Sequence, residues 1–119
     1  MVEYESDPLS RLFHALADPT RRAMLQGLAD RPLTVGELAA PFDMSLAAAS
    51  KNIRVLEQAG LIQRKVQGRT HICQLEAMPM HGGLEWIRHY ERFWNERLDI
   101  LERLLAEDDA GQADSEPKT

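Results

Sequence analysis

The chain has 119 residues, of which 44% are hydrophobic, and its formal net charge is −5 at pH 7. A chain of this length suits one domain that buries roughly two thirds of its unfolded surface. It has no apolar run near the roughly 18 residues of a membrane span, an acidic N-terminus unlike a signal peptide, and one cysteine, which makes no disulfide within the chain. We therefore expect a cytoplasmic globular protein with no membrane partner.

The negative charge gathers at the two ends of the chain. Residues 1–8 carry −3 and residues 106–119 carry −4, which leaves +2 on residues 9–105. Residues 45–75 hold five cations against Glu57, a local charge of +4. Because salt screens charges beyond roughly 8–10 Å, a polyanion would respond to this local patch. We predict a disordered acidic segment over 1–7, one folded domain over 8–105 and a disordered acidic tail over 106–119.

Two Asp-Pro pairs, Asp7-Pro8 and Asp18-Pro19, each indicate a helix start with Asp as the cap and Pro in the first turn. The first of these helices carries an apolar stripe of Leu9, Leu12, Phe13 and Leu16. On the second helix, Arg21 and Arg22 could touch phosphate or pair with acidic neighbours, and we favour the structural role for Arg21.

The stretch from residue 34 to residue 60 predicts two short helices joined by a tight turn. Thr34 and Glu37 have the spacing of a capping box, and Pro41 opposes a long continuation of that helix. Ser45 is placed to cap a second helix over 46–59, which stops at Gly60. This arrangement is typical of a helix-turn-helix, whose second helix can enter the major groove of DNA.

The second helix has an apolar face and a polar face. Ala49, Ile53, Leu56 and Ala59 recur at helical spacing and should pack inward. The other face begins with small or apolar residues that let a duplex approach, continues with Lys51 and Arg54 for phosphates, and offers Ser50 and Asn52 for base edges. An ordinary solvated helix surface is the alternative interpretation.

Residues 61–75 predict a strand, a turn around Gly68 and a second strand. A basic hairpin directly after a recognition helix is typical of a wing that contacts DNA, although a charged edge can also serve only to block aggregation. The predicted DNA-binding residues of both elements are Thr34, Ser45, Leu46, Ala47, Ala48, Ser50, Lys51, Asn52, Arg54, Arg64, Lys65, Gln67, Gly68, Arg69 and Thr70.

The last part of the chain predicts a linker over 76–79, a flexible joint at Gly82-Gly83 and a helix from Leu84 to about Leu105 that is apolar on two faces. At ~1.5 Å per residue this helix would be roughly 33 Å long. One face can cover its own domain and the other can pack on a second subunit, together with the first helix. The predicted dimer interface comprises Leu9, Leu12, Phe13, Trp86, Tyr90, Phe93, Trp94, Ile100, Leu101 and Leu104. A monomer whose core takes both faces is the alternative.

Four segments together resemble the winged-helix repressors of the ArsR family: ADPTRRAMLQGL (17–28), LTVGELAAPFDMS (33–45), SKNIRVLEQAGLI (50–62) and KVQGRTHICQL (65–75). The resemblance covers roughly residues 8–105. It implies a mainly α (α+β) winged helix-turn-helix fold with about five helices, a two-stranded wing and a long C-terminal dimerisation helix. It also implies a homodimeric bacterial repressor. A two-fold dimer should read an imperfect palindrome with half-site centres one helical turn, about 34–36 Å, apart.

Many ArsR-like repressors sense a metal, and here the sequence departs from the pattern. The family's thiolate site lies on the helix before the turn, where this chain has Val35-Gly36-Glu37-Leu38. On the C-terminal helix, Arg92 follows His89 where a second ligand would be needed. We therefore predict no metal and no cofactor, and the inducer stays unknown. Strand alternation places Cys73 inward, which disfavours a redox switch.

The sequence is also compatible with other functions. A winged-helix module that binds proteins and not DNA would suit the overall acidity, and a metal- or redox-responsive repressor is a further alternative. We expect no enzyme, because no paired-carboxylate, thiol–imidazole or glycine-rich phosphate motif stands in a plausible context.

Overall fold

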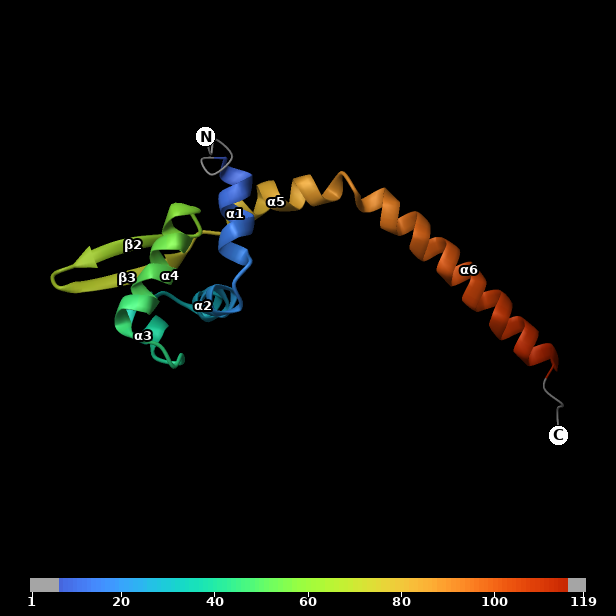
Figure 1. Cartoon of the computed structure of the whole chain (residues 1–119), viewed down its shortest axis with the longest axis horizontal. Helices are drawn as coiled ribbons and strands as arrows, with labels where there is room; N and C mark the ends of the chain where they lie inside the picture. Colours follow the sequence, from blue (N-terminus) through green and yellow to red (C-terminus); the bar gives the residue numbers. More distant parts are fainter. Residues whose placement is uncertain (1–6, 116–119) are drawn as a thin grey trace. The chain divides into compact units, whose positions relative to one another are not determined.

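The computed structural model describes residues 7–115, which form six helices and a three-stranded antiparallel sheet (Figure 1). In chain order these are α1 (Pro8–Leu16), α2 (Pro19–Asp30), β1 (Leu33–Thr34), α3 (Val35–Ala39), α4 (Leu46–Gln58), β2 (Ile62–Gln67), β3 (Thr70–Leu75), α5 (Met78–Arg88) and α6 (Glu91–Ser115). The chain divides into two compact units between Leu84 and Glu85. This confirms the predicted mainly helical winged-helix fold, with one helix more than expected.

Both Asp-Pro pairs start helices as predicted. The side chain of Asp7 accepts a hydrogen bond from the backbone N–H of Ser10 at 3.1 Å, and Asp18 accepts one from that of Arg21 at 3.0 Å. Each Pro sits in the first turn, where the missing N–H would have no partner within the helix. Asp7 is thus the ordered cap of α1 and not part of a disordered segment, while residues 1–6 lie outside the described residues.

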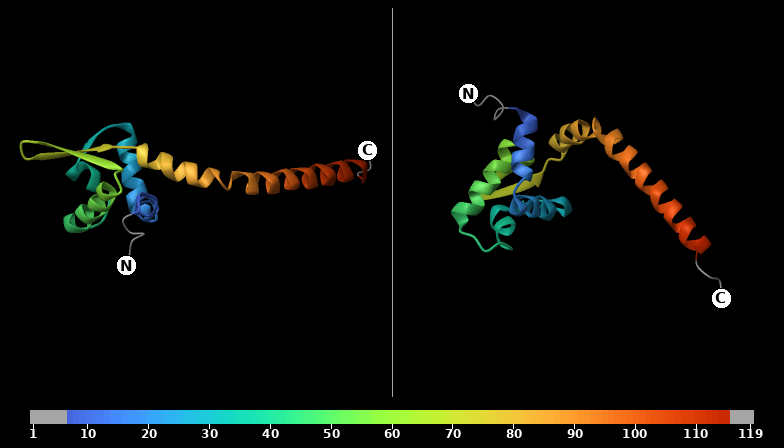
Figure 2. Two further views of the ribbon diagram at one scale, coloured as in Figure 1. Left: turned by 90° about the horizontal axis from the view of Figure 1, so that it is seen from above. Right: turned by 45° about the vertical axis from the view of Figure 1, so that its right-hand side comes forward.

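The wing is a hairpin of β2 and β3 that carries a third, very short strand on its other edge. β3 lies in the middle, with Leu33 opposite Cys73 on one side and Ile62 opposite Leu75 on the other. The turn end of the hairpin reaches past α3 and α4 in Figure 1 and in the left-hand view of Figure 2. The prediction of two strands missed β1 because two residues show no alternation.

The hydrophobic core of the first unit lies between the helices and the base of the hairpin. Its members are buried hydrophobic side chains from α1, α2, α3, α4, β2 and β3, together with Leu61: Leu12, Ala15, Met24, Leu25, Leu28, Leu38, Ala49, Ile53, Leu56, Leu61, Ile62 and Cys73. The predicted inward face of α4 is confirmed at Ala49, Ile53 and Leu56, which are all completely buried. Gly60 follows with φ 75°, the left-handed conformation expected of a C-cap glycine.

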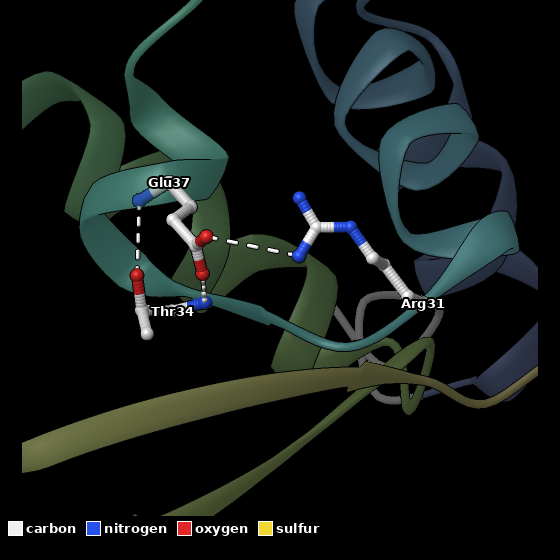
Figure 3. Close-up of polar contacts among 3 residues, drawn as sticks. All are labelled: Arg31, Thr34 and Glu37. Atoms are coloured by element: carbon white, nitrogen blue, oxygen red, sulfur yellow. Dashed lines mark hydrogen bonds and ion pairs between the residues drawn. The ribbon is translucent and has the colours of Figure 1, made fainter.

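The predicted capping box starts α3. The Thr34 hydroxyl accepts a hydrogen bond from the Glu37 backbone N–H at 3.1 Å, and the Glu37 carboxylate accepts one from the Thr34 N–H at 2.9 Å. Arg31 lies 3.7 Å from the same carboxylate (Figure 3). The hydrogen bonds from Thr34, with a smaller contribution from the charge of Arg31, lower the pKa of Glu37.

The region after the wing differs from the prediction. Residues 78 and 79, expected in a linker, and the glycine pair, expected to be a flexible joint, belong to α5. Pro79 is tolerated because it sits in the first turn. Gly83 is buried, and a Cβ there would lie 2.5 Å from Leu12 Cδ2, so this glycine allows α5 to approach α1 closely.

The single helix predicted over 84–105 is in fact two. His89 N–H bonds to Trp86 C=O and Tyr90 N–H bonds to Ile87 C=O, which are three-residue steps that end α5 before α6 begins. The prediction that the chain is disordered from residue 106 is wrong for residues 106–115, which continue α6 to Ser115, because alanine and glutamate in this stretch are good helix formers. None of the helices among residues 7–115 is long and apolar enough to cross a membrane.

The contact at Gly83 leads to a prediction about stability. Gly83→Ala should lower the free energy of unfolding by about 1 kcal/mol, because overpacking against buried Leu12 outweighs the gain in helix propensity. Gly82→Ala is the control: an added Cβ there meets no described atom within 4 Å, so the free energy should rise by about 0.5–1 kcal/mol. Urea unfolding followed by circular dichroism measures both, and equal stability of the two variants would contradict the close approach.

The capping box gives a prediction about pH. Because the folded pKa of Glu37 is lowered, its stabilising bond to Thr34 should be complete above the ordinary glutamate pKa and be lost as the pH falls through the lowered value. The amide proton shift of Thr34 in NMR spectra should show this step, and Glu37→Gln should abolish it. Thr34→Ala should keep most of the lowering, because the backbone bond is its largest cause. A step at or above the ordinary pKa would be inconsistent with this cap.

Candidate nucleic-acid interface

The outer face of α4 is the first part of the candidate interface. Leu46, Ala47, Ala48, Lys51 and Arg54 are all exposed. Leu46 is 66% exposed. The first turn of α4 therefore presents a weakly polar surface to solvent, and two cations follow on the next turns.

Ser45 and Ser50 differ in their availability. The Ser45 hydroxyl oxygen accepts a hydrogen bond from the Ala48 backbone N–H at 3.1 Å and so caps α4 as predicted. Its O–H can still donate to a phosphate oxygen. Ser50 is half-buried and lies at the edge of the outer face.

Asn52, predicted to read base edges, is engaged within the protein. Its Oδ1 accepts a hydrogen bond from an Arg21 guanidinium N–H at 3.2 Å, and its Nδ2 lies 3.8 Å from the sulfur of Met44. Arg21 also donates to the carbonyl oxygens of His14 at 2.9 Å and Ala15 at 2.8 Å. Arg21 thus has a structural role as predicted, but its partners are carbonyl and amide oxygens and not the acidic neighbours that the sequence suggested. Asn52 is correspondingly not a freely exposed side chain.

The tip of the wing is the second part of the candidate interface. Lys65, Gln67, Gly68, Arg69 and Thr70 are all exposed. Gly68 has φ 63° and Arg69 does not have a positive φ, the pattern of a two-residue type II′ turn that suits the twist of a hairpin. The tip of the wing, which is the turn with the adjoining strand ends, thus holds two cations and two polar side chains.

Arg64 is placed differently from the other cations of the wing. Its guanidinium lies 2.5 Å from the Glu57 carboxylate of α4 and 3.4 Å from the His71 ring, and its buried Nε has no hydrogen-bond partner among the described residues. Arg64 therefore ties the wing to the end of α4, a role that the sequence did not reveal. Its contact with DNA stays a prediction.

A shallow open groove runs between the start of α3 and the wing. It is lined by Thr34, Val35, Gly36, Arg64, Arg69, Thr70 and His71. Four of these, Thr34, Arg64, Arg69 and Thr70, were predicted as DNA-binding residues, and the fold brings them together. His71 was not predicted, although the register that pairs Arg64 with Cys73 puts His71 on the diagonal from Arg64.

Cys73 and the side chains that could bind a metal are two further kinds of reactive group. Cys73 is completely buried as predicted, and this burial raises the pKa of its thiol, with a smaller opposing effect from Arg64. A buried neutral thiol is a poor nucleophile and a poor redox sensor. Within residues 7–115, no group of three His, Cys, Asp or Glu side chains is gathered to hold a metal ion.

The residues predicted for the dimer interface fall into three groups. Leu12 is only 2% exposed and belongs to the core, so its assignment to the dimer interface is wrong. Its side chain packs against Gly83 of α5. Leu9 and Phe13 are half-buried. The members on α5 and α6, and Tyr90 between them, are between 43% and 56% exposed: Trp86, Tyr90, Phe93, Trp94, Ile100, Leu101 and Leu104.

Comparison with known proteins identifies the family of the chain. A helix-turn-helix domain family model matches residues 16–64. The HTH-type transcriptional regulator Rv2034 of Mycobacterium tuberculosis is 39% identical over 96 residues, which cover 80% of this chain and 86% of that protein. The transcriptional repressor SdpR of Bacillus subtilis is 27% identical over 82 residues, or 69% of this chain and 91% of that one.

Comparison with solved structures also indicates a transcriptional regulator. A crystal structure of an ArsR family transcriptional regulator superposes with a TM-score of 0.70 at 43% identity, over 75% of this chain and 98% of the other. These relatives are regulators of transcription. From its fold and from these likenesses, the chain belongs to the ArsR family of winged helix-turn-helix transcriptional regulators and is a DNA-binding protein.

Proposed function

We propose that this regulator is a cytoplasmic homodimeric repressor that binds a palindromic operator through α4 and the wing. The observation that carries the proposal is the exposed surface shared by the two elements: the first turns of α4 with Lys51 and Arg54, and the basic turn of the hairpin. Glu57 is the one acidic residue between residues 45 and 75, and it is paired with Arg64.

In this proposal α4 and the wing contact different parts of the DNA. The small side chains of Ala47 and Ala48 let the start of α4 come close to base edges in the major groove. Lys51 and Arg54 are exposed, and each can neutralise a phosphate beside that groove. Lys65 and Arg69 at the wing would hold the neighbouring backbone or reach the minor groove.

A second copy of the chain is the proposed partner of α6. At 100° per residue, the apolar side chains of α6 fall within an arc of about 160°: Phe93, Trp94, Leu98, Ile100, Leu101, Leu104 and Leu105. Each of them is at least 43% exposed. The two stripes predicted from the sequence are therefore neighbours on one broad face. A continuous exposed apolar face of this kind marks a protein interface, and a two-fold dimer fits a palindromic operator.

A metal is not part of the proposed mechanism. The start of α3 presents valine, glycine and a glutamate that is already engaged in a cap, where a thiolate site would need cysteines. The proposal names no inducer, and release through falling protein concentration is sufficient for an autorepressor.

Charge removal on α4 tests the DNA-binding surface. A Lys51→Ala, Arg54→Ala double variant should bind its operator at least roughly tenfold more weakly at physiological salt. The slope of log affinity against log salt concentration should become shallower by about 3.6, because a dimer loses four phosphate contacts and each contributes about 0.9 to the slope. A Gln26→Glu, Ala29→Glu variant on the exposed face of α2 changes the net charge equally and should keep the slope. Fluorescence anisotropy at several salt concentrations measures both. An unchanged slope in the α4 variant would favour a module that does not use this surface for DNA.

A charge in the apolar face of α6 tests the dimer. Leu101→Glu should turn a micromolar dimer into a monomer and weaken operator binding, because a buried unpaired carboxylate opposes association. Arg103→Gln changes the net charge equally on the opposite side of α6 and should remain dimeric. Sedimentation equilibrium gives the mass of each. A wild-type protein that is monomeric at micromolar concentration would refute the proposed homodimer.

A further inference from the structure

We infer that Arg21 is a positioning residue for DNA recognition: its guanidinium forms a clamp, made of Arg21, Asn52 and the carbonyl groups of His14 and Ala15, that sets the rotation of α4 about its own axis. The inference rests on the proposed use of α4 as the recognition helix. It gives a function to an arginine outside the DNA-binding surface and to an asparagine that was predicted to lie on it.

The guanidinium itself is held firmly at one end. Its Nε donates to the Ala15 carbonyl at 2.8 Å and one terminal nitrogen donates to the His14 carbonyl at 2.9 Å. These carbonyls belong to the last turn of α1. The His14 carbonyl also accepts the Ala17 N–H at 3.3 Å, whereas the residue four positions after Ala15 is Pro19, which has no N–H to donate. The backbone N–H of Arg21 is bound by the Asp18 cap at 3.0 Å. The planar group is thus oriented by α1 and α2 before it meets α4.

The remaining terminal nitrogen reaches the middle of the recognition helix. It donates to Asn52 Oδ1 at 3.2 Å, across 31 residues of sequence, and Asn52 is half-buried. The Asn52 Nδ2 points to Met44, in the turn that precedes α4. One side chain of α4 is therefore fixed to α1 and α2 on one side and to the turn on the other.

A directional contact is needed here because the core beneath α4 is apolar. Ala49, Ile53 and Leu56 hold α4 on the core through contacts that are not directional. Turning α4 by about 20° would move an atom about 5–6 Å from its axis by about 2 Å, whereas N–H···O distances vary by only ~0.5 Å. Lys51, next to Asn52, and Ala48, one turn before it, would leave their places on the DNA. The hydrogen bond at Asn52 opposes this rotation.

The clamp makes a prediction that separates positioning from charge. Arg21→Lys keeps the positive charge but replaces the fork of donors with one ammonium. The probes are a duplex that the wild-type protein selects from a random-sequence pool and an unrelated duplex of equal length. Affinity for the selected duplex should fall roughly tenfold, while affinity for the unrelated duplex and the salt slope should not change, since no phosphate contact is lost.

Arg22→Lys is the matched control. Arg22 is the next residue and also caps α1, through a bond to the Leu16 carbonyl at 2.7 Å, but no hydrogen bond links it to α4 in the described structure. It should bind both duplexes as the wild type does. Asn52→Ala should repeat the loss seen for Arg21→Lys, and the double variant should lose no more than either single one, because both remove the same contact.

Three results would overturn the clamp: wild-type affinity in Arg21→Lys, additive losses in the double variant, or a shallower salt slope, which would place Arg21 on a phosphate. A measurement without DNA keeps the test independent of the proposed operator. Hydrogen exchange of the free protein should accelerate in α4 for Arg21→Lys and not for Arg22→Lys. If the wild type selects no duplex, the proposed function fails, and the exchange result alone decides the clamp: faster exchange confined to α4 supports it, and uniform or unchanged exchange refutes it.

Discussion

The packing of α4 on the core is the contact on which the proposed DNA-binding surface depends. Ala49, Ile53 and Leu56 are completely buried at helical spacing, and their burial determines which side of α4 remains outside. The same contact places the end of α4 beside the wing, where Glu57 meets Arg64. The two basic segments therefore lie beside each other because of the way this helix packs on the core.

The distribution of charge shows why a protein of net charge −5 can serve as a DNA-binding regulator. The acidic residues concentrate toward the chain ends, while residues 45–75 are cationic. Solvent and salt screen distant charges, so a duplex near α4 responds mainly to the cations around it. The Arg64–Glu57 pair reduces the free positive charge of this surface by one. The remaining positive charge is carried by four exposed side chains: Lys51, Arg54, Lys65 and Arg69.

Much of the first unit could be predicted from sequence because its signals are local. The Asp-Pro starts, the capping box at Thr34 and the glycine stop at Gly60 each act through a few neighbouring residues, and the structure confirms them. Asn52 could not be placed, because its partner Arg21 is 31 residues away. Leu12 was misjudged for a similar reason: an apolar stripe reveals that a face is covered, not that Gly83 of the same chain covers it. The break between α5 and α6 could not be predicted, because no glycine or proline lies between Arg88 and Glu91.

The ion pair between Glu57 and Arg64 has a consequence for protein engineering. Exchanging α4 alone between relatives, in order to transfer operator preference, would leave Arg64 facing whatever residue the donor carries at position 57. The smallest segment to transfer is therefore the helix together with its hairpin, residues 45–75, because both partners of the ion pair lie inside that segment. The helix and the wing should be exchanged together and not one without the other.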